Sequence, residues 1–121
     1  MGNYTKDFEL LNATTSTGAG TATNVQGYRW LHFQTDGFNY AAAPATSTRV
    51  VAETTVSGNK WILTTVLDLA NNTATTTIAT NSVFRLVDDI GGIVGFRLRV
   101  ATFNGVEASI TAVGRAMMFA G

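Results

Sequence analysis

The stretch FRLRV, residues 96–100, alternates apolar and charged side chains. Because successive side chains of an extended chain point to opposite faces, this pattern predicts a β-strand with residues 96, 98 and 100 facing a core and two arginines facing outward. Threonine and valine dominate the rest of the chain, and both are β-branched and suit a pleated sheet. No segment repeats apolar residues at helical spacing between capping residues. The sequence therefore predicts an all-β protein.

Runs of this kind, separated by turn residues, predict about eight antiparallel strands. Their expected ranges are 8–13, 21–25, 29–35, 48–56, 61–69, one or two strands within 73–87, 93–102 and 106–117. Short strands without intervening helices indicate a β-sandwich, and about eight of them fit a jelly-roll-like arrangement. Residues 8–121 are expected to form this single domain, preceded by an N-terminal arm at residues 1–7.

One hairpin is expected around the loop at residues 57–60. Joining the strands 48–56 and 61–69 through this loop sets Val56 opposite Trp61 and Ala52 opposite Thr65. One face of the pair is then mainly apolar and contains the indole ring. This register predicts that Trp61 belongs to the core.

A second hairpin is expected at the C-terminal end of the chain. A three-residue loop at 103–105 pairs Leu98 with Ile110 and keeps the two arginines of the FRLRV stretch on the outer face. Gly105 would supply the positive φ that this loop requires. The sequence thus predicts that the last two strands are hydrogen-bonded neighbours.

Composition limits the classes of partner. Of 121 residues, 45% are hydrophobic and only 13% charged, with 8 basic and 8 acidic side chains. A surface poor in charge is cheap to desolvate, which favours packing against other proteins. The zero net charge and the lack of a basic patch disfavour nucleic acid as a partner. Neither a signal peptide nor a run long enough to span a bilayer is visible, so no membrane partner is expected.

The residues that carry chemistry are few and scattered, so we expect no enzyme, no cofactor and no metal. The chain lacks cysteine, which excludes disulfides and thiol chemistry. His32 is the only histidine, and without a nucleophile-elbow motif a structural or surface role is expected for it. Asp88 and Asp89 stand beside two glycines without the spacing of a calcium loop, which predicts a turn.

Three aromatic residues lie in expected loops and form the candidate interface: Phe38, Tyr40 and Phe103. Clustered exposed apolar groups on a weakly charged surface usually mark a contact with another chain. For Phe103 an alternative stays open with nearly equal weight, in which the hairpin folds over and the ring closes the end of its own sandwich.

Three features resemble small structural proteins of tailed bacteriophages. The first is LLNAT at 10–14, followed by a glycine-rich break and VQGY at 25–28. The others are SGNKW at 57–61, and FRLRV at 96–100 followed by a Thr- and Ala-rich strand ending in GRA at 114–116. The chain resembles in particular the capsid decoration, or cement, proteins with a jelly-roll-like β-sandwich.

The resemblance implies a virion protein made in the host bacterial cytoplasm and located on the capsid surface. Its partners would be the major capsid protein or other virion proteins, and it would form a homo-oligomer. That family has no catalytic motif, so no residue inherits a role.

Two other classes of function stay open on residues alone. A carbohydrate- or receptor-binding module, as in a tail fibre or lectin, is suggested by DGFNY at 36–40, where aromatics adjoin Asp and Asn. A hydrolase would need two carboxylates from different strands, and the sequence brings no particular pair together.

Overall fold

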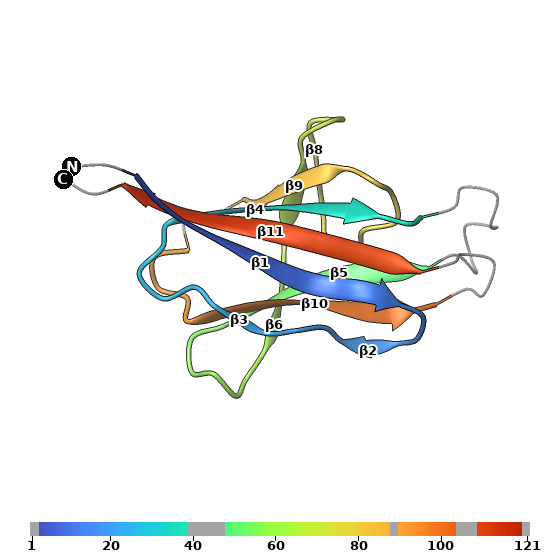
Figure 1. Ribbon diagram of the computed structural model, residues 1–121, viewed down its shortest axis with the longest axis horizontal. Coiled ribbons are helices and arrows are strands. Elements are labelled where there is room, and N and C mark those ends of the chain that lie inside the picture. The colour runs from blue at the N-terminus through green and yellow to red at the C-terminus, as the bar shows by residue number, and fades with distance from the viewer. Residues whose placement is uncertain (1–2, 39–47, 88–89, 104–108, 120–121) are drawn as a thin grey trace.

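The computed structural model describes residues 3–38, 48–87, 90–103 and 109–119. All regular structure in these ranges is β-strand, arranged in two antiparallel sheets that lie one over the other (Figure 1). The predicted all-β sandwich is confirmed. The described residues form eleven strands rather than about eight, because 61–69 and 73–87 each contain two strands and a short strand precedes the expected strand at 21–25.

The two sheets differ in size. The first sheet runs in the order β1-β11-β4-β9-β7-β8, with β1 at Asn3–Thr14, β4 at Trp30–Asp36, β7 at Val66–Asp68, β8 at Thr73–Thr75, β9 at Val83–Leu86 and β11 at Ile110–Phe119. The second sheet runs in the order β2-β10-β5-β6, with β2 at Gly18–Ala19, β5 at Arg49–Thr55, β6 at Ile62–Thr64 and β10 at Gly95–Thr102. The short β3 at Thr23–Asn24 also pairs with β10.

The strand pairs are nested along the chain. β1 pairs with β11, β2 and β3 pair with β10, β4 pairs with β9, and β5 pairs with β6. This pattern arises when one long hairpin of successive strand pairs rolls up into two layers, which is the jelly-roll arrangement. The strand β7, with β8 beyond it, extends the first sheet past the nested pairs.

The core lies between the two sheets and is centred on three phenyl rings. The rings of Phe33 and Phe84 are stacked with their centres 5.2 Å apart, and the centre of Phe96 lies 5.6 Å from that of Phe33. Phe33 and Phe84 come from the first sheet and Phe96 from the second. The rings therefore connect the two layers through contacts that water does not reach.

The predicted C-terminal hairpin is wrong in its pairing. β10 lies in the second sheet against β5, whereas β11 lies in the first sheet between β1 and β4 (Figure 1). The faces of both strands were nevertheless predicted correctly, because Leu98 and Ile110 are both fully buried. The two strands face the same core from opposite layers, so their alternation matches a hairpin without forming one.

The predicted hairpin around residues 57–60 exists, but its register differs by one residue. Ala52 pairs with Thr64 rather than Thr65. The chain then leaves the second sheet at Thr65 and continues as β7 in the first sheet. Since a shift of one residue moves each side chain to the opposite face, Trp61 lies on the outside of the second sheet and not in the core. Gly95 makes room for the indole there, as a Cβ at Gly95 would lie 3.1 Å from the ring.

The strand predicted at 8–13 is longer than expected. β1 begins at Asn3, which pairs with Phe119, and Asp7 pairs with Arg115. Residues 3–7, placed in the arm by the sequence, thus lie in the first sheet. The ring of Phe8 occupies the space that a side chain at Gly114 would fill, so the two residues fit together across the strands.

Candidate functional site

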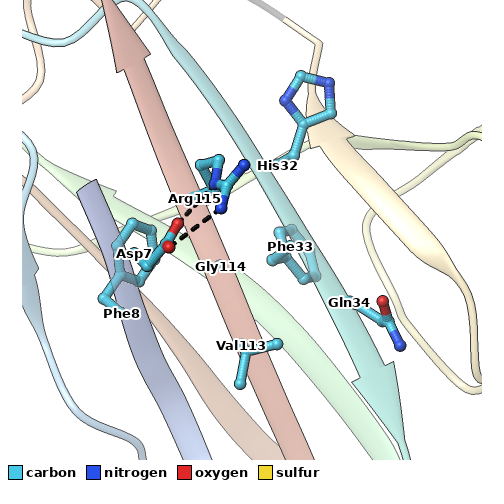
Figure 2. Close-up of a pocket in the computed structure, with 8 residues that line it drawn as sticks. All are labelled: Asp7, Phe8, His32, Phe33, Gln34, Val113, Gly114 and Arg115. Atoms are coloured by element: carbon cyan, nitrogen blue, oxygen red, sulfur yellow. Dashed lines mark hydrogen bonds and ion pairs between the residues drawn. The ribbon is translucent and has the colours of Figure 1, made fainter. Parts of the chain in front are cut away.

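The outer face of the first sheet contains a hollow of about 600 Å³ (Figure 2). Three adjacent strands, β1, β11 and β4, bring Asp7, Arg115 and His32 into one row across the sheet. Gln34 and Val113 form the next row, and the bare backbone of Gly114 separates the rows. The hollow therefore combines an acid, a base, an imidazole and an amide over a small area.

Asp7 and Arg115 are held together by two hydrogen bonds. Arg115 donates its Nε–H to Oδ1 and its Nη2–H to Oδ2 of Asp7, the second at 3.0 Å. The hydrogen bond from Arg115 lowers the pKa of Asp7 below its ordinary value. Both side chains are exposed, so the pair contributes little to stability. Its fixed, planar geometry suits the recognition of a polar ligand.

His32 is half-buried beside this pair. Burial, with the positive charge of Arg85 as a second cause, lowers the pKa of His32 below its ordinary value, so the ring is neutral at pH 7. Its Nδ1 is buried without a hydrogen-bond partner in the described part of the chain. Within the described residues, no carboxylate accepts a hydrogen bond from Nδ1 of His32.

Within residues 3–38, 48–87, 90–103 and 109–119, no three histidine or carboxylate side chains come together to hold a metal ion. Asp88 and Asp89, where a turn was predicted, lie outside these ranges. The same ranges contain no helix long and apolar enough to cross a membrane.

The structure does not bring the three predicted interface aromatics together on the surface. Phe38 is only 6% exposed and belongs to the core, so the prediction that it is exposed is wrong. The reason is that Asn81 binds both backbone groups of Phe38, accepting from its N–H at 2.8 Å and donating to its carbonyl at 3.3 Å, which folds the turn inward. Phe103 is half-buried and packs against the core, as in the alternative given for it. Tyr40 lies outside the described residues.

The outer face of the second sheet carries an ion-pair network that the sequence did not predict. Glu53 accepts one hydrogen bond from the Nε of Arg97 at 2.9 Å and another from the Nε of Arg99 at 3.0 Å. Burial raises the pKa of the Glu53 carboxyl, but these hydrogen bonds outweigh burial and hold the pKa below its ordinary value. The guanidinium of Arg97 also lies 4.3 Å from the centre of the Trp61 ring. We call the surface formed by Glu53, Trp61, Leu63, Arg97 and Arg99 the arginine face.

A third feature is an apolar groove of about 450 Å³ beside the β5–β6 hairpin. Five of its ten lining residues are apolar, namely Val56, Ile62, Leu86, Ile90 and Ile93. Val56 and Ile62 are well exposed, so the groove is open to solvent along this hairpin. Apolar surface of this kind favours contact with another molecule.

Comparison with known proteins shows what the chain is similar to. No family model matches it, and no curated protein matches its sequence. The crystal structure of the SPBc2 prophage-derived protein YomS superposes with a TM-score of 0.77 and 14% identity, over 96% of this chain and 95% of that protein. The crystal structure of the PBSX exported protein XepA gives a TM-score of 0.81 and 15% identity, over 96% of this chain but only 38% of XepA. The chain therefore shares its β-sandwich with the whole of YomS and with one part of XepA.

Proposed function

We propose that this chain is a non-enzymatic structural protein of a bacteriophage particle and that it decorates the outer surface of the capsid. The observation that carries the proposal is the end-to-end likeness of its single β-sandwich to the SPBc2 prophage-derived protein YomS. That likeness supports an origin in a phage genome. The location on the capsid comes from the resemblance of the sequence to decoration proteins.

The surface of the domain supports association rather than catalysis as its mode of action. Large apolar side chains are exposed on the β5–β6 hairpin at Val56, Ile62 and Leu63. Charged side chains make up only 13% of the chain, so the cost of removing water from this surface is low. Such a surface gains free energy when it packs against another protein.

A decoration protein would work by bridging neighbouring coat subunits. Each copy adds buried area across a seam, and a homo-oligomer would engage several subunits together. Weak individual contacts then act jointly, because once one is made the others form at high effective concentration. The particle would gain resistance to heat without any change in the coat subunits.

We expect this chain to be present in purified particles in a number comparable to that of the major capsid protein. Particles would be prepared from the host that carries the gene, and both chains quantified by mass spectrometry against labelled peptides. Particles from a phage with the gene deleted should open at lower temperature and regain their stability when the purified protein is added. Absence from the particle would refute a virion role, and presence in only a few copies would refute decoration in favour of a tail or neck position.

A second candidate function, a carbohydrate- or receptor-binding module, is favoured by the hollow on the first sheet. Its fixed Asp7–Arg115 pair and the free amide of Gln34 match the polar groups that bind sugar hydroxyls. A glycan array should then give a signal that Asp7→Asn and Gln34→Ala each remove, whereas Val56→Ser, on the other side of the molecule, retains it. An array with no signal for the wild-type protein would rule this candidate out.

A further inference from the structure

The two arginines of the arginine face are held in place by hydrogen bonds but still have unused hydrogen-bond donors. Each donates its Nε–H to a different oxygen of Glu53, which fixes both guanidinium planes. Within the described chain no residue accepts a hydrogen bond from their Nη groups. Arg97 and Arg99 therefore offer fixed Nη–H donors beside each other on one strand, and such donors lose little entropy when they bind an anion.

Positive charge is concentrated on this sheet. The strands of the second sheet contain three arginines, at positions 49, 97 and 99, and a single acid, Glu53. The strands of the first sheet carry more acids than bases. The strands of the second sheet therefore carry a net positive charge.

Two apolar side chains, Trp61 and Leu63, lie on the same face as the arginines. The ring of Trp61 supports the guanidinium of Arg97 from one side. Leu63 pairs with Glu53 from the edge strand β6 and is 52% exposed. Tryptophan and arginine are among the side chains enriched at the energetic centres of protein interfaces. On this surface the Trp61 ring and the Arg97 guanidinium are in contact, and Leu63 lies on the edge strand.

We propose that the arginine face is the docking surface for a protein partner that presents an Asp or Glu carboxylate next to an apolar side chain. The carboxylate would accept hydrogen bonds from the Nη groups of Arg97 and Arg99, and the apolar group would rest on Trp61 and Leu63. The inference builds on the proposed function, since it names the chemistry of the protein that this chain binds.

Protein fits this surface better than nucleic acid. DNA binding depends on neutralising many phosphates in a row, and here a buried carboxylate, Glu53, sits between the two arginines and would repel a phosphate chain. The exposed leucine and the indole have no role in a contact with a phosphate backbone. Both groups gain from the burial of an apolar side chain of a protein.

The test uses co-sedimentation of the purified chain with particles from the gene-deleted phage. We expect Arg97→Gln and Arg99→Gln each to weaken binding about tenfold or more, because each removes a charge-assisted hydrogen bond. Either variant leaves Glu53 one arginine partner, and unchanged unfolding curves would confirm that the fold is retained. Arg85→Gln is the matched control, since it removes an arginine from β9 on the opposite sheet and should bind as the wild type does.

The outcomes separate this inference from the proposed function. If the wild type binds particles and both variants bind equally well, the docking surface is wrong while decoration stands. If the wild type does not bind particles, decoration fails, and a fluorescent peptide of alternating Asp and Leu becomes the probe. Binding of that peptide, lost in both variants, would support the arginine face, and no binding would overturn it. Duplex DNA binding or self-association lost in the same variants would also overturn it, because the partner would then be of another kind.

Discussion

Replacing Phe33 with alanine is expected to lower the free energy of unfolding by about 3–5 kcal/mol. Phe33 is 2% exposed and its ring contacts both Phe84 and Phe96, so its removal leaves a cavity where the two sheets meet. Neighbouring strands are hydrogen-bonded in place and cannot close such a space fully. Denaturant unfolding followed by tryptophan fluorescence or circular dichroism measures the loss.

Val113→Ala provides the control for this variant. Val113 lies on β11 next to β4 but faces outward and is half-exposed, so its truncation should change stability little. A loss below about 1 kcal/mol for Phe33→Ala would mean that the site collapses around the missing ring. The packing between the sheets would then be looser than the structure shows.

Replacing Glu53 with alanine is expected to lower the free energy of unfolding by about 2–3 kcal/mol at neutral pH. The carboxylate is 7% exposed and is the shared partner of Arg97 and Arg99, so its removal leaves two guanidinium groups facing each other. Because both arginines are partly exposed, water takes over some of the lost interaction, and the loss is smaller than for a fully buried pair.

Asp7→Ala is the matched control for Glu53→Ala. Asp7 also accepts a hydrogen bond from the Nε of an arginine, Arg115, but this ion pair is exposed to solvent. Loss of the pair should therefore leave the unfolding curve almost unchanged. Equal effects of the two substitutions would show that burial of the ion pair has no energetic role in this protein.

The Glu53 carboxylate is also expected to make the folded protein less stable as the pH falls. The pKa of Glu53 lies below its ordinary value of 4.5 in the folded chain, so the unfolded chain takes up the proton first as the pH falls. The stabilising contribution of the Glu53 carboxylate is therefore complete above the pKa of the unfolded chain and is lost as the pH falls through the lower pKa of the folded chain. Stability measured from pH 6 downward should fall less steeply for Glu53→Ala than for the wild type.

Sequence patterns predicted the faces of the strands better than their partners. Alternation along β10 depends only on which side is buried, and it identified both the buried Leu98 and the outward arginines. Pairing depends on how distant segments pack, and residues 61–69, which read as one β-rich run, divide between two sheets at Thr65. The same limit applies to the surface sites, since Glu53 and its arginines are more than forty residues apart in the chain.

Phe38 shows a second limit of sequence reasoning. Its place after β4, next to Gly37, is typical of an exposed loop, and the sequence does not reveal that Asn81 binds its backbone. An asparagine side chain that replaces a backbone partner leaves no periodic signal. The hollow on the first sheet was missed for a related reason, because its residues converge only once β1, β11 and β4 are adjacent.

The nested pairing of the strands also has a consequence for how this chain reaches its structure. β1 pairs with β11, with Asn3 opposite Phe119, so the strand β1 cannot form its hydrogen bonds until β11 is in place. Such high contact order slows folding, because long loops must close before the contacts that stabilise them can form. During synthesis the early strands leave the ribosome with unpaired edges, and these edges are the places where nascent copies would associate wrongly. The yield of soluble protein should therefore depend on the rate of synthesis and on temperature more than on the stability of the finished fold.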